Sequence, residues 1–239
     1  IQKTVTDAQR VGFSNIGLDL ISAIPNATLH SWKHSLHCAV DLGVQHISAY
    51  GLSIETGTDL DRQIRLKQVT PLDEDRDRAM YEFTIDFLEE HQFPQYEISN
   101  FSRKGYECQH NLGYWRNQPF LGIGPAAASY WLGQRSTNVA DVREYIKRIR
   151  QHTDACHERQ VIALRDRTCE TAVLNLRMRQ GIDLRRFQQI TGQDALQVFD
   201  HAIESQRGLG LLDAQDQHLR LTRKALPIAD SVLCHFSTI

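Results

Sequence analysis

The sequence of 239 residues lacks the cysteine spacing that marks an iron–sulfur cluster or a disulfide framework. No CxxC or CxxxCxxC run occurs, although a cubane cluster needs several thiolates that converge, usually from one short loop. The five cysteines are widely spaced: Cys38, Cys108, Cys156, Cys169 and Cys234. An odd number of dispersed cysteines is typical of reduced thiols in a cytosolic protein.

Long apolar runs and a strong charge of one sign are also missing. No stretch approaches the roughly 20 apolar residues that span a bilayer. The first residues, 1–7, contain neither an initiator Met nor an apolar signal core, so we expect the sequence to start inside a longer, cytoplasmic protein. A net charge of -2 and a pI near 6.6 argue against a dedicated binder of nucleic acid or anionic membranes.

The composition that remains is that of an ordinary globular protein. Hydrophobic residues make up 41% and charged residues 23% of the chain. The length suits one large domain or two smaller ones.

The front of the chain alternates between two kinds of apolar pattern. Period-two stretches predict strands, and amphipathic stretches with a capping Thr28 or an acidic first turn predict helices. The expected elements are strands at 12–24, 44–54 and 94–101 and helices at 28–43 and 73–91. Strand–helix–strand alternation predicts parallel pairing with right-handed crossovers, so this part is α/β.

From residue 101 onward, the sequence predicts a loop followed by helices. Residues 101–130 are rich in glycine, aromatic and polar residues, which favours a loop. A helical pattern follows, with a candidate two-stranded wing at 208–222, and the whole is typical of a winged-helix arrangement. The expected helices lie at 139–150, 168–180, 182–190, 193–206 and 223–236.

Three motifs in succession are the most specific feature of the sequence. They are YEISNF at 96–101, CQHNLGYW at 108–115 and LGIGPAAASY at 121–130. In the second motif a His and an Asn precede two aromatic residues by one helical turn.

This second motif has two readings. His110 beside Asn111, with Tyr114 and Trp115 one turn on, could provide an axial iron ligand and flat walls for a macrocycle. Alternatively it is a structural loop, in which the polar pair bonds the backbone and the aromatic pair enters the core. The residues alone leave both readings open.

The order and spacing of the three motifs resemble the signature of the HemW-type radical SAM haem chaperones, relatives of oxygen-independent coproporphyrinogen III oxidase. The HNxxYW motif of that family falls on His110, Asn111, Tyr114 and Trp115. The resemblance implies that these residues bind haem, with His110 as the candidate ligand.

The resemblance extends over nearly the whole chain. It implies an α/β fold made of the rear strands of a partial (β/α) radical SAM barrel, at 1–135. A mainly helical, winged-helix-like domain would follow at 136–239. Further matches to the family lie at 19–32, 46–58, 80–81, 170–181 and 219–224.

The resemblance also implies cofactors. In that family the barrel strands hold S-adenosylmethionine at their C-terminal ends, which would place Asp19, Ser53 and Ala128 in the cofactor pocket. Asp19 could equally be a helix cap or turn residue. The cysteine ligands of the family's [4Fe–4S] cluster lie upstream of the matched region. We therefore expect no metal ligands in this chain, and no radical generation by this chain alone.

Two departures from the family pattern fall at glycines. The family's GLPG is Ala23-Ile24-Pro25-Asn26 here, and its GPGAHS has Ala126 in place of the second glycine. An alanine at a position that uses left-handed backbone introduces strain.

Other clusters have simpler explanations. Cys108 with His110 supplies too few ligands for a structural zinc site. His30, His34 and His37 share a predicted helix, and the solvated face of that helix explains them.

Neither basic nor winged-helix features indicate DNA binding. The basic run that contains Arg143 and Lys147 suits the wet face of a helix. The best recognition-helix candidate, 193–206, carries Asp194, Asp200 and Glu204 and no basic residue, so a polyanion would repel it.

Three functions are consistent with these observations. The first is a HemW-like chaperone that binds haem and passes it to a respiratory haemoprotein, with peripheral membrane association through that partner. The second is the oxidase that converts coproporphyrinogen III. The third is a non-catalytic porphyrin-binding or winged-helix interaction module.

Overall fold

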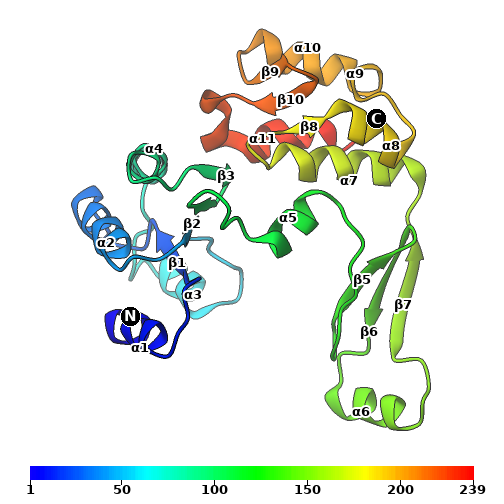
Figure 1. Ribbon diagram of the computed structural model, residues 1–239, viewed down its shortest axis with the longest axis horizontal. Helices are drawn as coiled ribbons and strands as arrows, with labels where there is room; N and C mark the ends of the chain where they lie inside the picture. Colours follow the sequence, from blue (N-terminus) through cyan, green and yellow to red (C-terminus); the bar gives the residue numbers. More distant parts are fainter. The chain divides into compact units, whose positions relative to one another are not determined.

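The computed structural model describes residues 1–239 and divides into two compact units, Ile1–Cys108 and Gln109–Ile239. Figure 1 shows the elements of both units along the chain. No helix has both the length and the apolar content that crossing a bilayer requires.

The first unit is built on a four-stranded sheet with strand order β1-β2-β4-β3. Its strands are β1 (Gly17–Ser22), β2 (His46–Gly51), β3 (Gln95–Glu97) and β4 (Asn100–Ser102). Its helices are α1 (Gln2–Arg10), α2 (Leu29–Asp41), α3 (Asp59–Arg65) and α4 (Glu74–Glu90).

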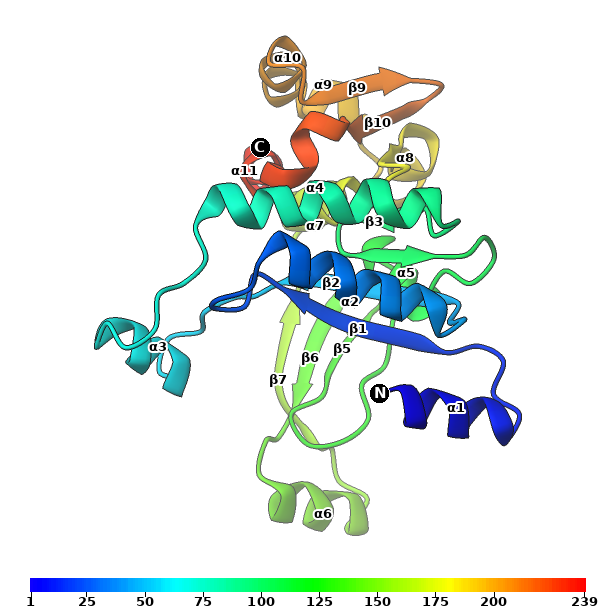
Figure 2. The same cartoon turned by 90° about the vertical axis from the view of Figure 1, so that its left-hand side faces the viewer.

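Helices α2 and α4 lie side by side on one face of this sheet, as Figures 1 and 2 show. The indole Nε1 of Trp32 donates a 2.8 Å hydrogen bond to Thr84 Oγ1 and joins the two helices inside the core. Leu36, Ile47 and Leu88 are fully buried between helices and sheet. Burial of these apolar side chains stabilises the layer.

Both helices begin where the sequence predicts. Thr28 caps α2 and forms a capping box with Ser31, and Asp73 caps α4 ahead of an acidic first turn. A side-chain oxygen at the cap satisfies one of the free N–H groups of the first turn, and acidic residues there interact favourably with the helix dipole.

The predicted parallel sheet is right for one strand pair and wrong for the next. β1 and β2 pair in parallel, but β4 pairs antiparallel to β2. The predicted strand at 94–101 is a hairpin with Ile98 and Ser99 at its turn. After α4 the chain forms β3 at the edge of the sheet. The tight turn then places β4 between β3 and β2.

The second unit opens with α5 (Gln109–Trp115), in the region expected to be a loop. A three-stranded antiparallel sheet follows, in the order β5 (Ala128–Trp131), β6 (Gln134–Asn138) and β7 (Cys156–Val161). Helix α6 (Val142–Arg150) lies between β6 and β7 in the chain.

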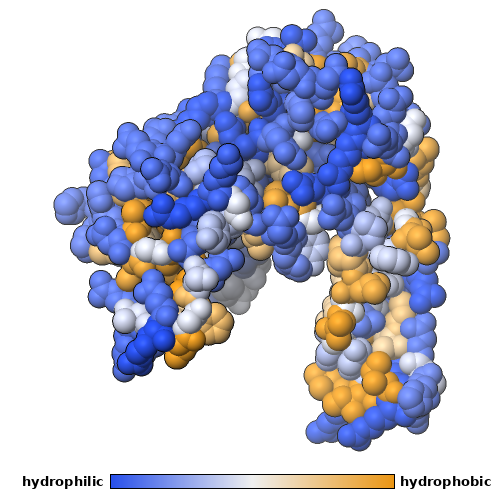
Figure 3. Space-filling view, in the orientation of Figure 1, coloured by the Kyte–Doolittle hydropathy of each residue, from blue (hydrophilic) through white to orange (hydrophobic).

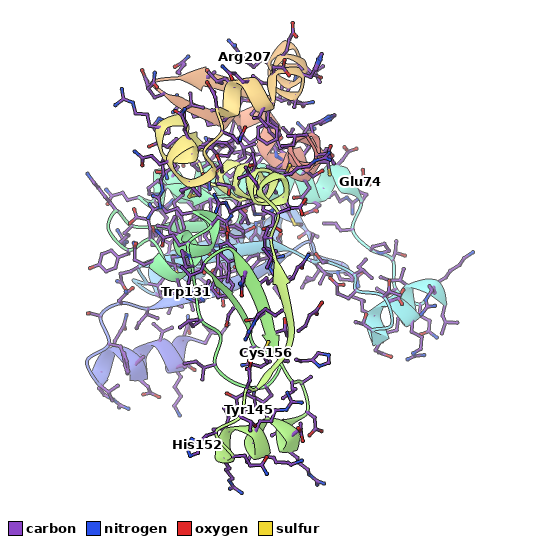
Figure 4. The ribbon with its side chains drawn as sticks, turned by 90° about the vertical axis from the view of Figure 1, so that its right-hand side faces the viewer. Glu74, Trp131, Tyr145, His152, Cys156 and Arg207 are labelled. Carbon is purple, nitrogen blue, oxygen red and sulfur yellow. The ribbon has the colours of Figure 1, made fainter.

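Sequence patterning did not reveal this sheet, because it has no apolar alternation. Every residue of β7 after Cys156 is exposed. Tyr145, labelled in Figure 4, contacts the loop before β5 through its hydroxyl, which accepts from Gly124 N at 3.2 Å. The apolar atoms in Figure 3 gather over α6, where Val142, Ile146 and Ile149 are exposed.

The C-terminal part of the second unit is mainly helical, as expected, and the wing is present. β9 (Leu212–Gln215) and β10 (His218–Leu221) form an antiparallel hairpin, and β8 (Ile182–Asp183) pairs with β10. The helices are α7 (Leu164–Leu176), α8 (Leu184–Thr191), α9 (Ala195–Val198), α10 (Asp200–Gly208) and α11 (Ala229–Leu233), with 3-10 turns at Arg223–Ile228 and Cys234–Phe236.

Two expected elements in this region differ in detail. The helix expected at 193–206 is divided into α9 and α10, and the one expected at 223–236 starts as a 3-10 turn containing Pro227. Proline lacks the N–H that an α-helix interior needs. The domain division expected after residue 135 stays a prediction; β6 runs across that position.

A half-buried polar contact in the first unit makes the stability of that unit depend on pH. His46 Nε2 is hydrogen bonded to the Tyr96 hydroxyl at 2.8 Å, and that hydroxyl accepts from Cys108 N at 3.4 Å. Burial lowers the pKa of His46 from its ordinary 6.5, whereas the nearby Asp19 carboxylate opposes this shift. The folded chain therefore favours the neutral imidazole.

We predict that the first unit loses stability on acidification. Below pH 6.5 the unfolded chain binds a proton at His46 that the folded chain does not, so this contribution is full above 6.5 and declines as the pH falls. Urea unfolding at pH 7.5 and 5.5 would measure the change. His46→Gln, which keeps a polar partner for Tyr96, should show a smaller pH dependence. Equal dependence in both chains would contradict the prediction.

Candidate functional site

The candidate site is the short helix α5, which carries all four residues predicted to bind haem. Leu112 is its buried residue. His110 and Tyr114 are four residues apart, so they share the opposite, exposed face. The helix therefore has one solvent-facing aromatic side and one packed side.

The exposed side is an ordered series of rings. His110 meets the edge of Tyr114 with 4.8 Å between centroids, and Tyr114 meets Phe120 at 4.7 Å. Phe120 is itself fixed to β5 by two backbone hydrogen bonds with Tyr130, of 2.8 and 2.9 Å. Edge-to-face contacts at these distances favour a defined ring orientation.

The packed side of α5 lies against α7. Trp115 is half-buried, its carbonyl oxygen accepts a 2.8 Å hydrogen bond from Asn175 Nδ2, and the Arg177 guanidinium lies 4.8 Å from its ring centroid. Asn111 is half-buried on the same helix. The structure thus separates His110 and Tyr114 from Trp115, and the haem roles of all four stay predictions.

The glycine-rich loop that follows α5 is tied to β5 and to its neighbours. Gly122 N donates to Ser129 Oγ at 2.9 Å, and Asn138 Nδ2 donates to Gly124 O at 3.0 Å. A Cβ at Gly122 would lie 2.1 Å from the Ala128 carbonyl oxygen, so only glycine fits there.

Comparison with known proteins finds similarity over nearly the whole chain. Residues 162–228 match the HemN C-terminal domain. Heme chaperone HemW of Bacillus subtilis is 30% identical over 229 residues, which cover 96% of this chain and 60% of that protein. The chain is therefore similar over nearly its whole length to a Heme chaperone HemW, and its C-terminal region matches the HemN C-terminal domain.

Two further relatives agree. Heme chaperone HemW of Mycobacterium tuberculosis H37Rv is 33% identical over 95% of this chain and 56% of its own length. The solved coproporphyrinogen III oxidase (HemN) of Escherichia coli, described as a radical SAM enzyme, has the same fold at a TM-score of 0.77. It shares 18% identity over 99% of this chain and 58% of that chain. The chain thus spans 60% or less of the length of these three proteins.

The family's glycine positions explain the strained backbone of this chain. Ala23 and Asn26, at the two glycines of the family's GLPG, have φ of 57° and 66°. Ala126, at the second glycine of GPGAHS, has φ of 57°. Left-handed backbone favours glycine, and asparagine tolerates it better than alanine.

The residues predicted to hold S-adenosylmethionine lie in both units. Asp19 is exposed on β1, opposite Ser48 of β2, and Ser53 is exposed just after β2. Ala128 is the first residue of β5, in the second unit. In the first unit, a groove of about 340 Å³ opens where β1 ends and is lined by residues 20–27 and by Ser31, Trp32 and Ser35.

This groove joins apolar side chains to the hydroxyl groups of Ser22, Ser31 and Ser35 at the C-terminal end of a parallel strand, the edge where such sheets bind ligands. Asp19, Ser53 and Ala128 do not line it, so their cofactor role stays a prediction. The residues present do not fit a [4Fe–4S] cluster. The five cysteines are all free, and no three or more His, Cys, Asp or Glu side chains converge. We therefore assign no cluster chemistry to these residues.

The remaining histidines do not form a metal centre. His34 Nε2 lies 3.6 Å from Cys38 Sγ on α2, which gives two ligands at most. His37 instead meets Phe87 edge-on at 4.6 Å. His30 is exposed, in agreement with a solvated helix face.

Sequence reasoning missed three supports of α5: Asn175, Thr171 and Phe120. Only Phe120 could have been found from the sequence, because a turn between residues 114 and 120 would bring its aromatic ring into contact with Tyr114. The two residues on α7 are polar residues inside a helix. Nothing in the local pattern says what they contact.

We predict that Ala126→Gly raises the free energy of unfolding by about 1 kcal/mol, because it removes left-handed strain at an exposed position. Urea unfolding of the chain would measure it. The neighbouring Ala127→Gly is the matched control: Ala127 has no left-handed backbone, so glycine there should lower stability. If the two changes had equal effects on the free energy of unfolding, the prediction of strain at Ala126 would be wrong.

Proposed function

We propose that this chain supplies the haem-binding part of a HemW-like haem chaperone. The observation that carries the proposal is the exposed imidazole of His110, ordered by Tyr114 on a helix docked into the second unit. The relatives named Heme chaperone HemW support it, since they match nearly the full length of this chain.

The side chains on this face have the chemistry that haem requires. An imidazole nitrogen is a common axial ligand of haem iron, and an aromatic ring packs favourably against the macrocycle. Because His110 is exposed, bound haem would keep one face accessible for transfer. Haem is therefore cargo in this proposal.

The proposed recipient is a respiratory haemoprotein, and peripheral membrane association would arise through that partner. A cytoplasmic location fits the free cysteines of the chain, because thiols stay reduced there.

We further propose that Asp19, Ser53 and Ala128 contact S-adenosylmethionine. When bound, this cofactor and a [4Fe–4S] cluster supply the radical chemistry of the family. The role of these residues is to bind the cofactor and to shape its pocket. Asp19 offers a carboxylate that can accept hydrogen bonds, and Ser53 and Ala128 offer backbone groups and small side chains.

Coproporphyrinogen III oxidase is the second candidate function, favoured by the fold shared with the Escherichia coli enzyme. The two functions differ in what the chain must do to a porphyrin. The chaperone needs an iron ligand, whereas the oxidase acts on a metal-free substrate. A His110-dependent iron bond is therefore the deciding property.

We predict that haemin titrated into the purified chain produces a saturable Soret shift near one equivalent, because the ligand and its supports all lie in the second unit. His110→Ala should abolish the shift. His157→Ala is the matched control: His157 is exposed on β7 and should bind normally.

No shift in the wild-type chain, or an equal shift in His110→Ala, would remove His110 as the ligand. The oxidase-like reading would then be favoured over the chaperone. Loss of the shift in both histidine variants would show that the loss is not specific to His110, and would contradict its role as the ligand.

A further inference from the structure

The C-terminal end of α5 is capped by side chains of another helix. The last carbonyl groups of a helix have no partner within the helix. Here the Trp115 carbonyl accepts from Asn175 Nδ2 on α7 at 2.8 Å, and Asn175 is 5% exposed. A buried carbonyl without this donor would be left unsatisfied.

A second hydrogen bond to α7 follows directly after the helix. Asn117 has a φ of 49°, and the next residue donates its N–H to Gly113 O, which ends α5 as a left-handed C-terminal motif. Asn117 Nδ2 also donates to Thr171 Oγ1 at 2.9 Å. Thr171 donates its own proton to the Arg167 carbonyl, so its oxygen is free to accept.

Both hydrogen bonds are made by side chains on one face of α7. Thr171 and Asn175 are one helical turn apart, and Arg177 lies over Trp115 just beyond them. Figure 1 shows α5 beside α7. α7 lies within the region that matches the HemN C-terminal domain.

We propose that Asn175 is a positioning residue for haem: with the Asn117–Thr171 bond, it sets the orientation in which α5 presents His110 and Tyr114. The inference rests on the proposed haem-binding function. A helix of seven residues has little stability of its own, so its direction follows from where it is tied. The HemN C-terminal domain thereby becomes part of the haem site without touching the cargo.

Two variants test this role. Asn175→Asp has the same size, but its carboxylate cannot donate to the Trp115 carbonyl and repels it. Asn117→Gly keeps the left-handed backbone and removes only the bond to Thr171. We expect haemin affinity to fall about tenfold in Asn175→Asp, as for a lost buried hydrogen bond, and several-fold in Asn117→Gly.

Two further readouts separate positioning from general stability. The His110-dependent Soret shift of both variants should be smaller than that of the wild-type chain at saturating haemin. Amide hydrogen exchange of the haem-free chain should speed up in residues 109–118 of both variants, and the unfolding temperature of Asn117→Gly should change little. Glu170→Gln is the matched control: Glu170 lies on α7 like Asn175, and the change breaks its 2.9 Å ion pair with Arg135 of β6, so this variant should behave as wild type.

Wild-type affinity and an unchanged Soret band in both variants would overturn the proposal. If Asn175→Asp does not fold, Asn117→Gly decides alone, because its backbone conformation is preserved. If even the wild-type chain shows no His110-dependent binding, the proposed function fails. Hydrogen exchange of the haem-free variants then still decides whether Asn175 orients α5.

Discussion

The candidate site depends on one constraint: α5 is too short to be a stable helix by itself. Its seven residues form few internal hydrogen bonds, while nucleating a helix is unfavourable. Packing therefore determines its conformation. Leu112 is buried beneath it, Asn175 satisfies its last carbonyl, and Phe120 supports its exposed ring. Each of these contacts acts on the orientation of His110, although none involves its imidazole.

Two residues in different parts of the chain adopt backbone conformations that glycine would accommodate with less strain. Ala23 and Ala126 both have left-handed backbone, at positions where the pattern that the sequence resembles has glycine. Ala126 N donates to Val139 O at 3.0 Å. Strained conformations persist only where neighbouring contacts over-determine them. The loop shape is thus retained in this chain despite the loss of the glycines.

The sequence predicted elements whose signals are local. The cap Thr28, the acidic start of the helix at Asp73, the helices that follow and the wing at 208–222 are all present, since side-chain oxygens and turn residues act within a few positions. It did not predict β6 and β7, whose residues are largely polar and exposed. Nor could it predict that β4 pairs antiparallel to β2, because pairing is a long-range property.

For the site, the motif identified the segment that forms α5. It did not predict which of its residues pack against the protein and which face solvent. Trp115 and His110 lie in one motif, yet one packs on α7 and the other faces solvent. That division follows from helical geometry once α7 is in place. The contact with Asn175 spans 60 residues of sequence, so no local pattern encodes it.

The geometry also bears on which function suits this face. An oxidase benefits from enclosing its substrate, because water and competing reactions must be excluded from reactive intermediates. A carrier must instead bind tightly enough to hold its cargo and leave a side from which a partner can take it. His110 and Tyr114 are exposed while their supports, Leu112 and Asn175, are buried. An exposed imidazole above buried supports satisfies the second requirement better than the first, which is why we propose the carrier role for this face.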